Sequence, residues 1–182
     1  MTAALHSLTR RDLPPLPPGP TRVLMVCLGN ICRSPLARLL LQETITQRGL
    51  QARISVDSCG TGPWHIGKPA DPRSVAAARR HGLVLTHRAR QLDAAGDLDR
   101  FPLLIAMDAD NARTLVSRGA DADRIRLLRA FDPSLADVHD HQTLAVPDPY
   151  HEADEAFDEV FRMIRAAGHG LVDAILAAQE SA

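Results

Sequence analysis

The sequence is short of cysteine, lysine and aromatic residues, and neither charge is in excess. Three cysteines in 182 residues, Cys27, Cys32 and Cys59, are too few for a disulfide framework, so we interpret them as free thiols in a reducing compartment. The 21 basic and 22 acidic residues give a net charge of -1. This balance excludes the broad cationic field of a nucleic-acid-binding protein.

Long apolar runs are also absent. No stretch approaches the roughly 20 apolar residues that a membrane helix needs. The first 21 residues include a proline-rich run at 14–20 but no continuous apolar segment that would direct secretion. We therefore predict a cytoplasmic protein without membrane association, whose residues 1–21 form a flexible, proline-rich leader.

What the sequence does contain is an alternation of short apolar runs and amphipathic segments. The runs are typical of buried parallel strands, and the amphipathic segments begin and end at capping residues, proline and glycine. This order predicts one α/β domain over residues 22–180, a doubly wound four-stranded parallel sheet flanked by helices. The predicted strands lie at 22–26, 54–57, 103–107 and 124–128, and the predicted helices at 34–49, 71–82, 110–118 and 157–176.

The turn after the first predicted strand carries the strongest functional signal. Residues 27–34 read CLGNICRS, which is C-x5-R-S between a strand and a helix N-terminus. Five intervening residues allow several backbone N–H groups to converge on one anion, and Gly29 and Asn30 tolerate the dihedral angles of such a curl. Arg33 adds a fork for two phosphate oxygens. These positive surroundings favour a nucleophilic thiolate at Cys27.

The segment VCLGNICRSP resembles the signature loop of the low-molecular-weight protein tyrosine phosphatases. The resemblance extends over about residues 22–178 and implies a phosphotyrosine hydrolase that acts on protein substrates without metal or cofactor. Other matching segments follow in the family's order: Asp57-Ser58, Trp64, PADPR at 69–73, HRARQ at 87–91, Met107-Asp108 and Asp148-Pro149-Tyr150.

The resemblance also implies a role for each motif residue. Cys27 is expected to form a phosphocysteine, and Asp148 to act as general acid and then as general base. The chemistry requires such an acid, because the nucleophile Cys27 and the permanently charged Arg33 cannot protonate the leaving oxygen. The expected phosphate-binding residues are Leu28, Gly29, Asn30, Ile31, Cys32, Arg33 and Ser34.

Trp64 and Tyr150 are the chain's one tryptophan and one tyrosine, and both match positions that line the family's aromatic slot. They are expected to sandwich a phenyl phosphate. Core packing is the alternative for Trp64, although its glycine- and proline-rich flanks favour a loop. Residues expected to support the phosphate loop are Ser34, Ser58, His87 and Asp108. Ser34 is expected to donate its hydroxyl to the Cys27 sulfur, and the other three to form hydrogen bonds to Asn30 or its neighbours.

Four alternatives remain open. Protein arginine phosphatases of this family tend to carry threonine where this chain has Ile31, and arsenate reductases need redox cysteines beyond Cys59, where none occur. A catalytically silent phosphate-binding module is disfavoured by the complete set Cys27, Arg33 and Asp148. A metal site is disfavoured because the loop already supplies electrophilic stabilisation; its ligands would be His139, Asp140, His141, Asp148 and His151.

Other features stay undecided at this point. Cys32 either forms a reversible disulfide with Cys27 or fills space under the loop, and Cys59 is expected to be inert. His151 stands where many relatives have a second tyrosine, which puts regulation by phosphorylation there in doubt. A monomer is the simplest expectation.

Overall fold

Four parallel strands form the centre of the molecule. The computed structural model describes residues 7–181, with strands β1 (Thr21–Cys27), β2 (Ile54–Gly60), β3 (Leu103–Ala106) and β4 (Ile125–Leu127). Their order in the sheet is β2-β1-β3-β4, and all pairs are parallel. The strand order therefore reverses beside the carboxyl end of β1, where parallel sheets bind their ligands.

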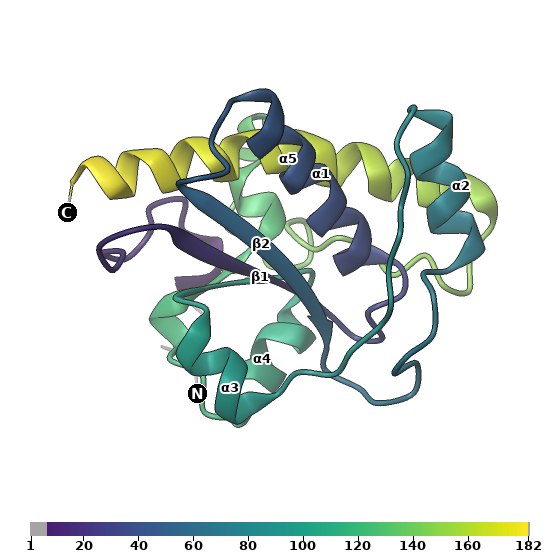
Figure 1. Cartoon of the computed structure of the whole chain (residues 1–182), viewed down its shortest axis with the longest axis horizontal. Helices are drawn as coiled ribbons and strands as arrows, with labels where there is room; N and C mark the ends of the chain where they lie inside the picture. Colours follow the sequence, from purple (N-terminus) through teal and green to yellow (C-terminus); the bar gives the residue numbers. More distant parts are fainter. Residues whose placement is uncertain (1–6, 182) are drawn as a thin grey trace.

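Helices cover both faces of this sheet (Figure 1). Helices α1 (Arg33–Gln47), α2 (Pro72–Arg80) and α5 (Asp154–Glu180) lie on one side, and α3 (Ala94–Arg100) and α4 (Ala109–Ser117) on the other. Alternate strand residues divide between the two cores: Val23 and Met25 pack on the α1 and α5 side, and Leu24 and Val26 on the α3 and α4 side. The predicted doubly wound parallel fold is confirmed.

One helix, α3, was missed by the sequence analysis. Its seven residues read AAGDLDR, and only Asp97 and Leu98 are buried. A segment this short has no repeating apolar face, so periodicity cannot reveal it. The other elements differ from prediction mainly at their ends, since α1 begins at Arg33 and α5 continues to Glu180.

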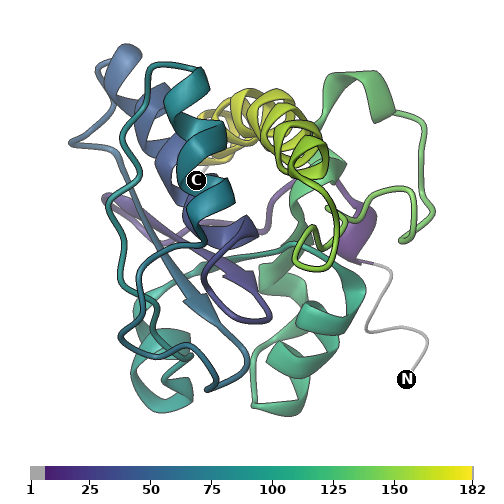
Figure 2. The same cartoon turned by 90° about the vertical axis from the view of Figure 1, so that its right-hand side faces the viewer.

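Residues 7–20, which were predicted to belong to a flexible leader, contact both cores of the domain. Leu8 is buried in the core on the α3 and α4 side, whereas Leu16 is buried in the core on the α1 and α5 side. The leader thus passes from one face of the sheet to the other (Figure 2), and Arg126 of β4 donates two hydrogen bonds to the Asp12 carbonyl, at 3.1 and 3.0 Å. Burial of Leu8, which precedes the prolines, and of Leu16, which lies between them, favours an ordered leader over these residues. Residues 1–6 of the expected leader lie outside the described range.

A substitution in this leader is expected to destabilise the whole domain. Leu8 is fully buried, so Leu8→Ala leaves a cavity and should lower the free energy of unfolding by about 2–4 kcal/mol. Urea denaturation measures this change. Val84, which is 82 % exposed, provides the control, since Val84→Ala should change stability by less than about 0.5 kcal/mol. Equal stability of the two variants would mean that the leader is not part of the cooperative core.

No helix within residues 7–181 is both long enough and apolar enough to cross a membrane.

Candidate active site

The loop between β1 and α1 lies at the carboxyl end of the sheet. Cys27 ends β1 and Arg33 begins α1, so the loop joins a central strand to a helix N-terminus. Asn30 has a φ of +54° and turns the chain back on itself. The hydrogen bonds found within residues 7–181 leave the backbone N–H groups of Gly29, Ile31 and Cys32 unused. These groups are available to an anion.

The sulfur of Cys27 lies at the centre of this loop, and the residue is 2 % exposed. The Asn30 backbone N–H donates to Sγ at 3.3 Å, and Ser34 Oγ lies 3.0 Å from Sγ. Ser34 Oγ accepts a hydrogen bond from Asn30 Nδ2 at 2.8 Å, and its own proton has two acceptors within reach, the Cys27 sulfur at 3.0 Å and the Cys59 carbonyl oxygen at 3.3 Å.

A buried network holds Asn30 in its left-handed conformation. Its amide Nδ2 also donates to Ser58 Oγ at 3.1 Å, and its Oδ1 accepts from the Arg90 backbone N–H at 2.9 Å. His87 Nε2 lies 2.8 Å from the Asn30 carbonyl oxygen. Three of the expected supporting residues, Ser34, Ser58 and His87, therefore contact Asn30 directly.

Burial lowers the pKa of His87, against the opposing effect of its hydrogen bond to Asn30. A lowered pKa favours the neutral ring, which has one N–H to donate. Because the Asn30 carbonyl accepts but cannot donate, that proton is on Nε2. His87 thus serves as a fixed donor to the loop.

Arg33 is buried beneath the loop and pairs with two carboxylates. Its Nη1 donates to Asp108 at 2.6 Å and to the Val146 carbonyl at 3.2 Å, and its Nη2 donates to Asp148 at 2.5 Å. The Arg33 side chain is 3 % exposed, whereas Asp148 is 40 % exposed. Asp108 supports the site through Arg33 and not through Asn30. Asp148 is open to a ligand.

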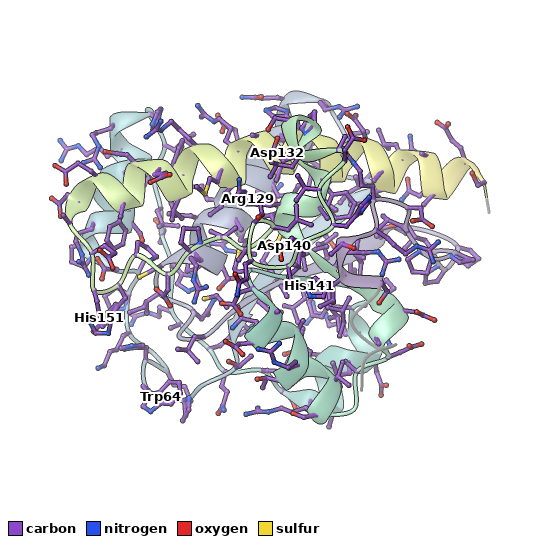
Figure 3. All side chains as sticks on the ribbon, turned by 180° about the vertical axis from the view of Figure 1, so that it is seen from behind. Trp64, Arg129, Asp132, Asp140, His141 and His151 are labelled. Carbon is purple, nitrogen blue, oxygen red and sulfur yellow. The ribbon has the colours of Figure 1, made fainter. Side chains whose placement is uncertain are left out.

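A pocket of about 330 Å³ lies above the loop. Trp64 is 62 % exposed, so the alternative of core packing for this residue is excluded. Trp64 and His151 lie on one edge of the molecule (Figure 3). The Tyr150 ring centroid is 6.0 Å from that of His65 and 4.9 Å from that of His151. The pocket is lined by Cys27, Leu28, Gly29, Ile31, Cys32, Arg33, Trp64, His65, Asp148, Tyr150 and His151.

Two residues that build this site, Gly60 and His65, were not predicted from the sequence, and the contact made by Arg73 of the PADPR segment was not predicted either. A Cβ at Gly60 would lie 2.8 Å from the Leu28 carbonyl oxygen, so only glycine lets β2 pass so close to the loop. His65 covers Gly29, where an added Cβ would lie 2.9 Å from the imidazole. Arg73 donates to the backbone of Tyr150, 77 residues away. Such contacts leave no local pattern in the sequence.

The other two cysteines have a different environment from Cys27. Burial raises the pKa of the Cys32 thiol to about 12, and burial also raises the pKa of Cys59. Both are therefore protonated near neutral pH and are poor nucleophiles. All three cysteines are free thiols in this structure.

The metal alternative has no geometric support in the part of the chain that the structure describes. Within it, no three His, Cys, Asp or Glu side chains are grouped to hold a metal ion. Asp140 and His141 lie well apart from His151 (Figure 3), and Asp148 is paired with Arg33.

A small oxyanion fits this arrangement better than any other ligand. Residues with unused N–H groups line the same pocket as Cys27, Arg33 and Asp148, at the N-terminus of α1. The fold and site together define a class of protein, the phosphatases that carry a cysteine in the phosphate-binding loop.

Comparisons with known proteins narrow this class. The family model described as "Low molecular weight phosphotyrosine protein phosphatase" matches residues 22–181. A low molecular weight protein-tyrosine-phosphatase of Streptomyces coelicolor is 41 % identical over 157 residues, covering 85 % of this chain and 93 % of the relative.

Solved structures show the same similarity. A protein tyrosine phosphatase from Entamoeba histolytica superposes with a TM-score of 0.78 at 28 % identity, covering 86 % of this chain and 97 % of that chain. DARP, described as a Drosophila arginine phosphatase, has a TM-score of 0.73 at 27 % identity, covering 83 % and 95 %. The chain belongs to the low molecular weight phosphotyrosine protein phosphatase family, whose members are hydrolases.

Proposed function

We propose that this chain hydrolyses phosphotyrosine in protein substrates through a phosphocysteine on Cys27, without metal or cofactor. The observation that carries the proposal is the meeting of Cys27, Arg33 and Asp148 in one pocket. The loop N–H groups and the Arg33 guanidinium supply the positive charge that phosphoryl transfer needs. The three free thiols fit a reducing compartment such as the cytoplasm.

The reaction takes place in two displacements. In the first, Cys27 Sγ attacks phosphorus, the bond to the phenolic oxygen breaks, and Asp148 gives its proton to that oxygen. In the second, a water molecule loses a proton to Asp148 and attacks phosphorus, and the sulfur–phosphorus bond breaks. Inorganic phosphate leaves, while Cys27 returns to the thiolate and Asp148 to the acid.

The walls of the pocket favour an aromatic phosphate. Trp64 and Tyr150 offer aromatic surfaces at its rim, against which a phenyl ring can pack. Ile31 lines the pocket at the position where arginine phosphatases of the family tend to carry threonine. An apolar side chain there gives the guanidinium of phosphoarginine no hydrogen-bond acceptor.

The test is a comparison of peptides that carry phosphotyrosine, phosphoserine or phosphoarginine, in buffer with and without EDTA. We expect kcat/KM for phosphotyrosine to exceed that for the others by about 10²-fold or more, with no effect of EDTA. Faster phosphoarginine turnover would identify an arginine phosphatase, and loss of turnover in EDTA would identify a metal-dependent enzyme. Phosphate binding without turnover would leave a binding module.

A further inference from the structure

The segment 147–153, which carries Asp148, has few attachments to the rest of the molecule. Val146, just before it, is fixed by a backbone hydrogen bond to the end of β3, and α5 begins immediately after it. Between these anchors, two side chains, Arg33 and Arg73, supply the hydrogen bonds that tie the segment to other parts of residues 7–181.

Arg73 holds the segment by its backbone. Its Nη2 donates to the Tyr150 carbonyl at 2.9 Å, and its Nη1 donates to the Glu152 carbonyl at 3.0 Å. The guanidinium also lies over the Phe157 ring, 4.4 Å from the centroid, in the first turn of α5. One side chain therefore fixes both the position of the segment and its entry into the helix.

Arg73 is itself tied to the phosphate-binding loop. Its Nε and Nη2 donate to the Asp71 carboxylate at 3.0 and 2.9 Å, and Asp71 is 7 % exposed. The Asp71 backbone N–H donates to the Ile31 carbonyl at 2.8 Å. Hydrogen bonds thus run from the phosphate loop through Asp71 and Arg73 to the segment that carries Asp148.

Arg33, the other residue that binds the segment, is not available to hold Asp148 throughout a reaction cycle. The Nη2 group that binds Asp148 belongs to the same guanidinium fork that a bound phosphate would engage. Asp148 must also be protonated to donate to a leaving group, and a neutral carboxyl binds a guanidinium more weakly than a carboxylate does. Arg73 donates to backbone carbonyls of the segment and lies 5.8 Å from the Tyr150 ring centroid. None of these contacts involves the Asp148 carboxyl or the phosphate site, so they do not change with either event.

We propose that Arg73 is a positioning residue for the general acid and holds Asp148 at the leaving oxygen after Arg33 has turned to the phosphate. This inference rests on the function proposed above for Asp148. A displacement of about 1 Å in a reacting group can reduce a rate by about 10²-fold. The geometry of the tether therefore affects the proton-transfer step and leaves phosphate binding intact.

The experiment compares kcat/KM for 4-nitrophenyl phosphate, which has a good leaving group, and phenyl phosphate, which has a poor one. Arg73→Met should reduce the phenyl phosphate value by roughly 10- to 100-fold and the nitrophenyl value by less than about threefold. In an Asp148→Asn background, Arg73→Met should cause no further loss that depends on the leaving group. Arg73→Lys, which cannot reproduce the planar fork, should show an intermediate effect.

Arg80 provides the matched control. It lies on the same helix and binds Asp158 of α5 through Nε and Nη2 at 2.9 and 2.6 Å, without contact to segment 147–153. Arg80→Met should leave both kcat/KM values within about twofold of wild type. The inference would be overturned if Arg73→Met lowered kcat/KM equally for both substrates. It would also be overturned if Arg73→Met still lowered kcat/KM selectively for phenyl phosphate in the Asp148→Asn background. Equal leaving-group dependence in wild type and Asp148→Asn would instead overturn the proposed role of Asp148.

Discussion

Replacement of Cys27 by serine is expected to abolish turnover, lowering kcat by at least about 10⁴-fold. The serine hydroxyl remains protonated near neutral pH, so the loop would face phosphorus with a far weaker nucleophile. Phosphate affinity should persist, because the loop N–H groups and Arg33 do not depend on the sulfur. Steady-state kinetics with a phosphotyrosine peptide measures the first effect, and calorimetric titration with inorganic phosphate measures the second.

Cys59 provides the control for this substitution. It is a buried free thiol at the end of β2, and its side chain does not line the pocket. Cys59→Ala should keep kcat within about twofold of wild type and lower stability by about 1 kcal/mol, the cost of a small cavity. Substantial turnover by Cys27→Ser would contradict a phosphocysteine on Cys27, whatever the behaviour of the control.

The second large effect is expected for Asp148→Asn, which removes the acid and keeps the shape of the side chain. We expect kcat/KM for phenyl phosphate to fall by about 10²- to 10³-fold, because the phenolate would leave without a proton. The loss for 4-nitrophenyl phosphate should be smaller, since nitrophenolate leaves without assistance. The measurement is kcat/KM for both esters, because this parameter reports the first displacement and is insensitive to hydrolysis of the phosphoenzyme.

A carboxylate in the preceding loop gives the comparison for Asp148→Asn. Asp140 accepts hydrogen bonds from the Thr143 backbone and hydroxyl, both at 2.8 Å, and lies outside the pocket. Asp140→Asn keeps an acceptor oxygen for these bonds, so both kcat/KM values should stay within about twofold of wild type. If Asp140→Asn and Asp148→Asn had similar leaving-group profiles, Asp148 would not be the acid.

The loop that we propose binds phosphate was predictable because its determinants are local. Cys27, Asn30, Arg33 and Ser34 occupy one turn between a strand and a helix, and the backbone between them sets their geometry. The element order was predictable for a similar reason, since apolar runs and caps mark most strands and helices. The exception, α3, is too short to show a period.

The leader illustrates the opposite case. Proline content indicates an extended chain but does not say whether that chain packs against anything. Burial of Leu8 and Leu16 depends on the two cores, whose residues come from segments far apart in the sequence. Composition alone therefore predicted flexibility where the folded chain has contacts.

The sequence by itself determined the nucleophilic loop, the parallel fold and, through the family resemblance, which aspartate to examine. Only the tertiary structure decided how Asp148 is held: Arg33 and Arg73 reach its segment from 115 and 77 residues away. Local motifs arise from bonds between neighbours along the chain, whereas these hydrogen bonds join a loop to residues of two helices that are far away in the sequence. The physical reason is that a side-chain hydrogen bond depends on position within about 0.5 Å, and residue spacing alone does not specify distances across a core.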